Sequence, residues 1–544
     1  MLPSRYFAFA ITCILCAATL LAASTIGPHW WFAFVALSVL VLVGVRDLTQ
    51  TRQAIRRNYP LLSHFRFFFE RIRPEIRQYL LEDDTEELPF SRVQRSIVYQ
   101  RAKNEVDKRP FGTQLDVYAP QYEWINHSIA PTDPPSHDFR IEIGGAQCAK
   151  PYSASVFNIS AMSFGALSAN AVRALNAGAK RGGFFHDTGE GSISRYHREM
   201  GGDLVWEIGS GYFGCRNADG SFSRERFREN AAFDAVKMIE VKLSQGAKPG
   251  HGGVLPGAKV TPEIAEARGV PVGVDCVSPA RHSAFSTPRG LLEFVAELRQ
   301  LSGGKPTGFK LAIGHPWEWF GIAKAMHETG LIPDFIVIDG GEGGTGAAPL
   351  EFTDHVGAPL REALMLVHNT LVGLGLRERV KLGASGKIVT AFDIARTLAL
   401  GADYCNSARG FMFALGCIQA QSCHTGRCPT GVTTQDALRQ RALVVPDKSE
   451  RVHQFHLNTL KALRELIAAA GLEHPRELGP EHVIRRVSST EVRSLAALHV
   501  WAKPGELLSG TPESPVFKVF WEAARSDSFA APAHLLSLRG SKLQ

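Results

Sequence analysis

Cysteine is scarce and unevenly placed in this sequence. The chain has 544 residues but only nine cysteines, and those at positions 13, 16, 148, 215, 276 and 405 are scattered. Scattered cysteines exclude the disulfide framework of a small secreted protein and favour a reducing compartment. The other three, Cys417, Cys423 and Cys428, follow the spacing C-x5-C-x4-C. They therefore need an explanation of their own.

The sequence also lacks a strong excess of charge of either sign. Its net charge is +7, from 60 Lys and Arg residues against 53 Asp and Glu residues. Aromatic residues are not interleaved with basic clusters as they are on nucleic-acid-reading surfaces, so we expect no nucleic-acid partner. The length is ample for a large core and for more than one structural unit.

Two long apolar runs, residues 6–23 and 30–45, stand near the N-terminus. Each is long enough to cross a thin bilayer as a helix. Only Arg5 precedes the first run, whereas eight arginines follow the second: Arg46, Arg52, Arg56, Arg57, Arg66, Arg71, Arg73 and Arg77. The positive-inside rule therefore predicts a two-pass transmembrane hairpin over residues 1–50 in the cytoplasmic membrane, with the catalytic body in the cytoplasm. A cleaved signal peptide is the alternative.

Composition divides the rest of the chain into three further regions. Residues 51–130 are predicted to form a basic juxtamembrane helical connector close to anionic headgroups; an ordinary solvated helix packed on the main domain is the alternative. Residues 131–435 carry the motifs described below. Residues 436–544 are expected to be a C-terminal helical extension, with one clear helix pattern over 453–471.

Short apolar runs alternate with helical patterns through the third region. The expected strands are 156–164, 183–189, 238–244, 271–278, 308–314, 334–340, 379–386 and 402–410. Eight strands that alternate with helices predict an α/β fold, a (β/α)8 TIM barrel. Nearly every strand ends in glycine, serine or a polar group, at the end of the barrel where active sites are built.

Glycine-rich loops follow the last three expected strands. Within 339–349, Gly341, Gly343 and Gly346 match G-x-G-x-x-G, but Pro349 follows instead of a helix start, which argues against a Rossmann site. The loop is better explained as a backbone-lined cradle for a flat or anionic cofactor. The loops at 384–387 and 407–410 lead into helices and predict a phosphate site.

A barrel with such a phosphate site and no dinucleotide loop favours FMN as the cofactor. Lys310, close to the end of a strand, is placed to face the edge of the flavin and stabilise its reduced anion. The alternatives are that the glycines serve only tight turns and that Lys310 is exposed at the surface.

The three clustered cysteines favour an iron–sulfur cluster. Four thiolates would close a structural zinc site or a complete cubane, whereas three suit a 3Fe–4S cluster, which needs no fourth protein ligand. Pro429 follows the third cysteine, as in many cluster loops. Zinc held by the cysteines with His424 or a more distant histidine, and free buried thiols, remain alternatives.

Taken together, these stretches resemble the FMN-binding synthase domain of the glutamate synthase large subunit. They are SAMSFGALS (160–168), HDTGEGS (186–192), KLSQGAKPGHGGVLPG (242–257), DGGEGGTGAAPL (339–350) and GCIQAQSCHTGRCPTGVTTQ (416–435). A membrane-anchored, stand-alone subgroup without a glutaminase domain is the nearest match. The resemblance implies an oxidoreductase acting on CH–NH2 donors, which binds FMN and a 3Fe–4S cluster and serves glutamate biosynthesis.

The resemblance also implies roles for particular residues. The cluster ligands would be Cys417, Cys423 and Cys428. The FMN surround would be Ala161, Met162, Ser163, Lys310, Gly340, Gly341, Gly386, Ala408, Arg409 and Gly410. Glu190 and Lys248 would be catalytic or substrate-site groups, and Arg268 would bind a carboxylate; alternatively, Glu190 only accepts backbone hydrogen bonds and the two cations lie at the surface.

Two departures from the family pattern leave the substrate and partners open. His251 and Val254 replace a carboxylate and a substrate-facing amide, so the oxo acid need not be 2-oxoglutarate. No glutaminase or pyridine-nucleotide domain is recognised, so ammonia and electrons are expected from outside, the latter from ferredoxin or a reductase subunit. The alternatives are a membrane-tethered FMN and iron–sulfur electron carrier, an amino-acid or methylamine-type dehydrogenase, and a barrel acting on purine mononucleotides.

Overall fold

The computed structural model describes residues 4–85, 88–510 and 512–532. The chain divides into two compact units, Met1–Ser91 and Arg92–Gln544, and each is considered by itself. The expected boundaries at residues 50, 130 and 435 remain predictions, and the last twelve residues of the expected extension lie outside the described part of the chain.

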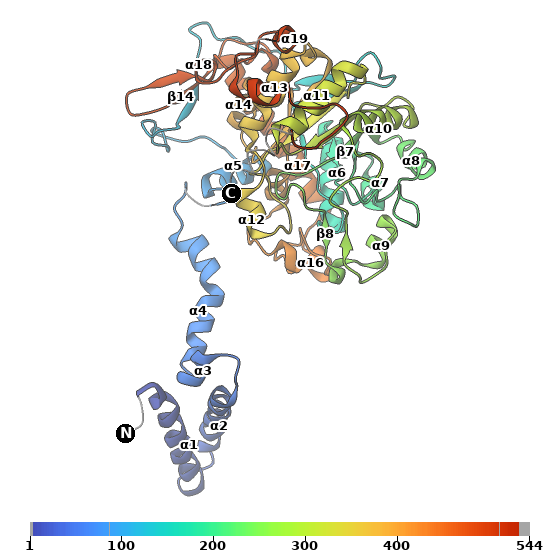
Figure 1. Ribbon diagram of the computed structural model, residues 1–544. Helices are drawn as coiled ribbons and strands as arrows, with labels where there is room; N and C mark the ends of the chain where they lie inside the picture. Colours follow the sequence, from blue (N-terminus) through green and yellow to red (C-terminus); the bar gives the residue numbers. More distant parts are fainter. Residues whose placement is uncertain (1–3, 86–87, 511, 533–544) are drawn as a thin grey trace, which may run out of the picture. The chain divides into compact units, whose positions relative to one another are not determined.

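The first unit is helical. Its elements are α1 (Phe7–Thr25), α2 (Trp30–Thr49), α3 (Ala54–Asn58), α4 (Ser63–Ile76) and a π-helical turn η2 (Arg77–Leu81). Helices α1 and α2 lie side by side as a hairpin (Figure 1). Helical segments Ser4–Thr25 and Trp30–Thr49, of 22 and 20 residues, are long and apolar enough to cross a membrane, which is evidence from length and composition alone.

The second unit contains a closed, all-parallel barrel of eight strands. In barrel order they are β4 (Phe157–Ile159), β5 (His186–Asp187), β6 (Leu204–Ile208), β7 (Val236–Lys242), β10 (Thr307–Leu311), β11 (Phe335–Asp339), β12 (Lys381–Ser385) and β13 (Tyr404–Ser407). The strands pair in sequence order and β13 closes on β4. The predicted (β/α)8 barrel is confirmed.

One expected barrel strand was wrong. Residues 271–278 yield only β9 (Cys276–Val277), which pairs antiparallel with β8 (Val254–Leu255) outside the barrel. Gly273 there adopts a positive φ of 74°, which interrupts an extended strand. The barrel strand that the sequence did not predict is β6. Its otherwise apolar run is interrupted by Glu207, which conceals the strand signal.

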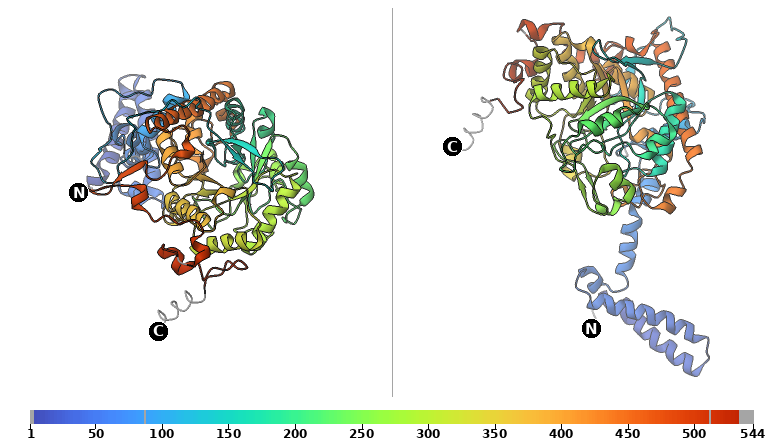
Figure 2. Two further views of the ribbon diagram at one scale, coloured as in Figure 1. Left: turned by 90° about the horizontal axis from the view of Figure 1, so that it is seen from above. Right: turned by 90° about the vertical axis from the view of Figure 1, so that its right-hand side faces the viewer.

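Helices surround the barrel strands (Figures 1 and 2). They are α5 (Arg92–Ala102), α6 (Ala169–Gly182), α7 (Arg195–Met200), α8 (Arg224–Ala231), α9 (Pro262–Arg268), α10 (Pro288–Leu301), α11 (Pro316–Thr329), α12 (Leu350–His355), α13 (Leu360–Gly373), α14 (Ala391–Ala399), α15 (Arg409–Leu415), α16 (Ala437–Arg441), α17 (Val445–Ala469), α18 (Leu495–Leu498), α19 (Glu506–Ser509) and α20 (Pro515–Phe520). Local signals set the ends: the Ser168 hydroxyl accepts from the N–H of Ala171 to begin α6, and Gly183 ends it at φ 65°. The long α17 packs against α6 and α5.

A β-hairpin plugs the amino-terminal end of the barrel. Strands β2 (Arg140–Ile143) and β3 (Tyr152–Ser155) pair antiparallel. Their Ile143, Tyr152 and Ala154 pack in one buried cluster with residues at or near the starts of barrel strands, among them Val205 and Tyr404. Because this end is filled with apolar side chains, polar chemistry is confined to the barrel interior and its carboxyl end. A small sheet of β1 (Glu123–Ile125), β14 (Val483–Arg486) and β15 (Val492–Ser494) completes the strands.

Candidate active site

The structure brings most of the sequence-predicted site residues to one end of the barrel. Ala161–Ser163 follow β4, Glu190 follows β5, Gly340 and Gly341 follow β11, Gly386 follows β12, and residues 408–410 follow β13. Because all eight strands are parallel, their carboxyl ends share one mouth. The loops there approach closely: a Cβ on Gly246 would lie 1.7 Å from the carbonyl oxygen of Gly340, so only glycine fits.

The Glu190 carboxylate lies in a narrow enclosure. A Cβ on Gly253 would lie 2.2 Å from Oε1, and a Cβ on Gly209 would lie 2.7 Å from Oε2. Lys242, the last residue of β7, places Nζ 3.2 Å from Oε1 and donates a hydrogen bond to Gln245 Oε1 at 2.6 Å. The amide Nε2 of Gln245 is buried without a hydrogen-bond partner among the described residues.

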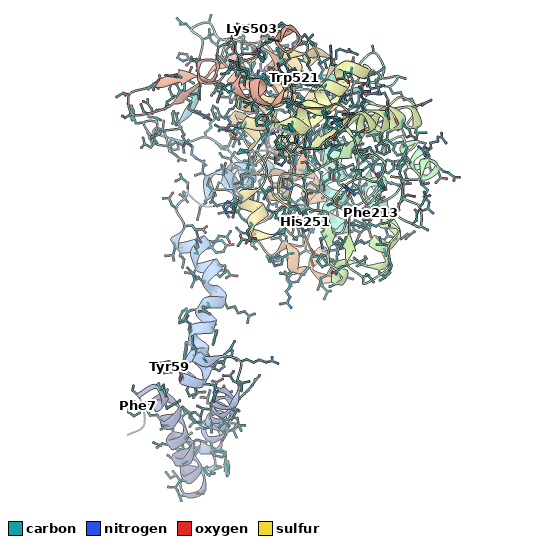
Figure 3. All side chains as sticks on the ribbon, viewed as in Figure 1. Phe7, Tyr59, Phe213, His251, Lys503 and Trp521 are labelled. Carbon is teal, nitrogen blue, oxygen red and sulfur yellow. The ribbon has the colours of Figure 1, made fainter. Side chains whose placement is uncertain are left out.

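Two further cations, Lys248 and Arg268, act electrostatically on Glu190. Both side chains are buried, and neither forms a salt bridge within the described residues. Arg268 Nη2 donates to the carbonyl of Phe164 at 3.1 Å, and its guanidinium lies 5.2 Å from the ring centroid of Phe213. Its Nε has no hydrogen-bond partner among the residues that the structure describes. Figure 3 labels Phe213 in the barrel unit.

The pKa shifts follow from this arrangement. Burial alone would raise the pKa of Glu190, but the charge of Lys242, its hydrogen bond and the charges of Arg268 and Lys248 hold the pKa below its ordinary value. Burial lowers the pKa of Lys248, while the Glu190 charge acts to raise it. The site therefore holds one ionised carboxylate among three basic groups.

Below the mouth, Lys310 lies in a buried acidic cluster. Its Nζ contacts Glu207 and lies 3.2 Å from Glu240 Oε1. Ligand atoms of Asp187, Glu207 and Glu240 all lie within 4.8 Å of one another. Since the Lys310 ammonium already serves as their cation, this trio needs no metal to explain it. The predicted role of Lys310 at the flavin edge remains a prediction.

Protons as well as charge stabilise this acidic cluster. Burial first, and then the charges of Asp187 and Asp339, raise the pKa of Glu240 well above its usual value. Burial also raises the pKa of Asp187, partly offset by the charges of Lys310 and Lys242. Asp187 and Glu240 can lie side by side because they share one proton, so that one is a neutral carboxyl and the other a carboxylate.

The cysteine loop begins where α15 ends. Gly416 turns the chain at φ 105°, Cys417 follows, Cys423 opens the short η5 (Cys423–Thr425), and Cys428 comes after it. The side chains of Cys417 and Cys428 are buried. From α5, the hydroxyl of Tyr99 donates to the carbonyl of Cys417 at 2.6 Å, which fixes the start of the loop.

Basic and hydroxyl groups surround the thiols. Lys259 Nζ donates to the carbonyl of Cys423 at 2.7 Å. Burial would raise the pKa of Cys428, but hydrogen bonds from Thr430 and Thr433 outweigh it and lower the pKa to about 7. Burial raises the pKa of Cys417, and the charge of Arg409 opposes that shift. The loop thus favours the thiolate at Cys428, the form that binds metals.

The two residues that depart from the family pattern lie in the loop between β7 and β8 and at the start of β8. His251 Nδ1 lies 2.8 Å from the carbonyl oxygen of Gly252, and its ring packs edge-on against Phe352. Figure 3 labels His251 on the same side of the unit as Phe213. Val254 opens β8 and is 38% exposed. Val254 directly follows Gly253, whose backbone lies against the Glu190 carboxylate.

Sequence reasoning missed the charged residues of the barrel interior. Lys242, Glu207, Glu240 and Asp187 were not singled out. A signal was present, because Glu240 and Lys242 stand two apart in β7, among Met238, Ile239 and Val241, and so point to the same face. The oppositely charged partners of these residues lie on other strands, and the sequence alone does not show which strands are neighbours.

Comparison with known proteins agrees with this architecture. Residues 134–473 match the family model described as "Conserved region in glutamate synthase". The chain is 40% identical over 483 residues to the "Glutamate synthase large subunit-like protein YerD" of Bacillus subtilis, covering 81% of this chain and 91% of that protein. It is 34% identical to an archaeal-type glutamate synthase (NADPH) of Thermotoga neapolitana, of which it spans 62%.

Among solved structures, a double mutant of flavocytochrome b2 with pyruvate bound matches 84% of this chain and 92% of its own, with 13% identity and a TM-score of 0.41. That likeness is too distant to bear on the site. The family match covers most of the chain and contains the barrel, Glu190, Lys248, Arg268 and the cysteine loop. The chain therefore belongs to the glutamate synthase family.

Proposed function

We propose that this chain reduces the imine formed from ammonia and a 2-oxo acid, 2-oxoglutarate or a close relative, to the amino acid. Family membership makes it a glutamate synthase-like oxidoreductase; the substrate, direction and electron source are our proposal. The observation that carries it is the pair of buried cations, Lys248 and Arg268, which form no salt bridge within the described chain and act with Lys242 on the one carboxylate of Glu190.

Two unpaired cations favour a dianionic substrate. An isolated buried charge is costly, and a bound carboxylate would offset the cost at each cation by charge-assisted hydrogen bonds. Arg268 donates from Nη2 to a backbone carbonyl and from Nη1 to Cys276 Sγ, and its Nε has no partner within the described part of the chain, so this donor remains for a carboxylate. Glu190 contributes the opposite charge and repels a third carboxylate. This pattern supports a 2-oxo dicarboxylate.

The residues present fit FMN. The Gln245 amide donor and the Asn406 Oδ1 acceptor are buried near the carboxyl ends of β7 and β13 without partners in the described structure, and a ring with carbonyls and ring nitrogens supplies both kinds. A Cβ on Gly344 or on Gly346 would meet nothing within 4 Å, so the loop after β11 leaves space. The residues expected to hold FMN are Ala161–Ser163, Lys310, Gly340, Gly341, Gly386 and 408–410.

The cysteine loop fits an iron–sulfur cluster better than one zinc ion. Structural zinc takes four protein ligands, and the loop supplies three cysteines. Three thiolates and their soft donor character suit a 3Fe–4S cluster held by Cys417, Cys423 and Cys428, which needs no fourth protein ligand.

The side chains of the site have separable roles. When bound, FMN supplies hydride to an imine carbon and an iron–sulfur cluster supplies single electrons. Arg268 and Lys248 bind the substrate carboxylates and orient the carbonyl carbon. Glu190, kept ionised by Lys242, accepts a proton from ammonium and returns it to the carbinolamine hydroxyl, which leaves as water and gives the iminium. The apolar side chains that fill the amino-terminal end of the barrel keep water from reaching the site from that end.

The proposal includes three partners: an electron donor, a source of ammonia and a membrane. We infer an external one-electron donor such as ferredoxin or a reductase subunit, and ammonia from solution or a separate protein. The hairpin of α1 and α2 is proposed to anchor the chain in the cytoplasmic membrane, with the barrel in the cytoplasm.

Val254 favours a second candidate. An exposed valine beside the Glu190 enclosure cannot hydrogen-bond a carboxylate, so the pocket would suit a less polar oxo acid, an amine oxidised in the reverse direction, or no substrate at all in a membrane-tethered electron carrier. The retained trio of Glu190, Lys248 and Arg268 favours the enzyme.

A single-turnover assay tests the proposal. Protein reduced anaerobically with dithionite is mixed with ammonium and 2-oxoglutarate, and glutamate is measured by mass spectrometry. Lys248→Ala should abolish glutamate while FMN stays bound, whereas Lys237→Ala, near the start of β7 and away from the mouth, should not abolish it. No amino acid from any oxo acid, with rapid reoxidation by a one-electron acceptor, would establish the carrier instead.

A further inference from the structure

Helix α4 presents one aromatic face that the structure leaves uncovered. Phe65, Phe68 and Phe69 are 66%, 54% and 57% exposed, and Ile72 and Ile76 extend the same stripe. The spacing of 3, 4, 7 and 11 residues from Phe65 places these side chains on one side of a helix. Contiguous exposed aromatics of this kind mark a binding surface.

A stripe beside this aromatic face of α4 and η2 is mostly basic. Arg66, Glu70, Arg73 and Arg77 repeat at intervals of 4, 3 and 4 residues, so they share one side of the helix, about 120° around the axis from the aromatic side chains. Glu70 pairs with Arg66 at 3.0 Å and Glu82 pairs with Arg77 at 3.1 Å, which leaves Arg73 as the exposed arginine of this stripe without a salt bridge among the described residues. A helix with aromatics on one side and arginines beside them has the pattern of a helix that lies in a membrane interface.

The start of α4 is fixed to the end of α2. Asp47, in the last turn of α2, is buried and accepts hydrogen bonds from His64 Nε2 at 2.9 Å and from the backbone N–H of Leu61 at 3.0 Å. Between them, Arg56 of α3 lies 4.9 Å from the ring centroid of Phe67. These contacts hold the first turn of α4 at the level where the second apolar helix ends.

We propose that α4 lies in the headgroup layer of an anionic phospholipid leaflet, with Phe65, Phe68 and Phe69 among the acyl chains and its arginines at the phosphates. Aromatic burial supplies the apolar attraction and the arginines select acidic lipid. The inference rests on the hairpin crossing the bilayer, because only then does the clamp at Asp47 place α4 at the surface. It makes the helix a lipid-binding segment and not merely a connector.

Position-specific fluorescence quenching in the full chain tests this. A genetically encoded, environment-sensitive fluorescent residue replaces Phe68, Arg73 or Val35 one at a time, which leaves the nine cysteines untouched. Each protein is reconstituted in phosphatidylcholine vesicles with or without phosphatidylglycerol. Brominated acyl chains then report contact with lipid, and iodide reports contact with water.

The three positions separate the possible outcomes. Val35, 57% exposed in α2, should be quenched by brominated lipid; if it is not, the hairpin itself fails. With the hairpin inserted, the Phe68 reporter should be quenched by lipid and the Arg73 reporter by iodide. Iodide quenching at Phe68 equal to that at Arg73, or protection of Phe68 from both quenchers by protein packing, would overturn the proposal.

Acidic lipid should strengthen the lipid contact at Phe68. Replacing Arg66, Arg73 and Arg77 together with Gln removes three cations, of which Arg73, without a salt bridge among the described residues, is worth about fivefold in partition to an anionic surface. The Phe68 reporter of this variant should lose its response to phosphatidylglycerol while Val35 stays inserted. A response that survives in the variant would refute selection by the arginines.

Discussion

The most demanding prediction concerns Lys310→Met in the barrel interior. Methionine retains most of the buried stem but leaves Glu207 and Glu240 without their ammonium partner. At 3.2 Å a unit pair interacts by about 5 kcal/mol at an effective dielectric constant near 20. The variant no longer buries an ammonium group, and the desolvation cost that disappears with it offsets part of that loss. The expected loss in the free energy of unfolding is therefore about 3–5 kcal/mol.

The pH dependence gives the prediction its sign. The raised pKa of Glu240 means that the folded state binds a proton which the unfolded chain releases above about pH 4.5, so this group's contribution falls as pH rises toward the folded pKa. Without Lys310, the remaining carboxylates must also take up protons to stay buried. The variant should therefore lose more stability at about pH 8 than at about pH 5.5.

Urea unfolding of the full chain in detergent, followed by far-UV circular dichroism at both pH values, measures this. Flavin content is determined in the same samples, because loss of a bound ligand lowers stability at both pH values alike. Lys310→Met with Glu207→Gln removes both charges and should recover most of the loss. An equal loss at both pH values, or no recovery in the double variant, would refute the reasoning.

Three further predictions concern the mouth and the cysteine loop. Arg268→Lys should weaken 2-oxoglutarate binding about 30-fold by calorimetry, because an ammonium cannot replace a planar guanidinium; unchanged affinity would remove Arg268 from the site. Cys428→Ala should abolish bound iron by metal analysis, whereas Cys148→Ala should retain it, and equal iron in both would exclude the loop as ligand. Burial lowers the pKa of Lys248, so its ammonium loses its proton at a lower pH than an exposed lysine does, and oxo-acid binding should weaken as the pH rises through that lower range. Glu190→Gln removes the charge that raises the pKa of Lys248 and should shift this loss of binding to still lower pH.

The barrel could be predicted because most of its strands carry their own signal. Phe335–Asp339, for example, is short, apolar up to its last residue, and followed by a glycine-rich loop. β6 could not be found in this way, since Glu207 is tolerated only through Lys310 of a distant strand. An ion pair between strands is a tertiary effect that overrides the local pattern.

The same contrast applies to the site. Glu190 and Lys248 stand in conspicuous motifs, whereas Arg268 ends α9 outside them, and its charge and that of Lys248 both act on Glu190. Lys242 looks like an ordinary strand residue, and only the folded chain shows it 3.2 Å from Glu190. The residues that tune the site lie on neighbouring strands far apart in sequence, so their roles depend on barrel closure.

The account depends most on the cofactors at the barrel mouth and the cysteine loop. Protein purified anaerobically in detergent should show flavin absorption bands, FMN on release, and about three irons per chain with a paramagnetic signal in the oxidised state. Zinc without iron, or a chain with no flavin, would contradict the proposed electron path from Cys417, Cys423 and Cys428 to the substrate site.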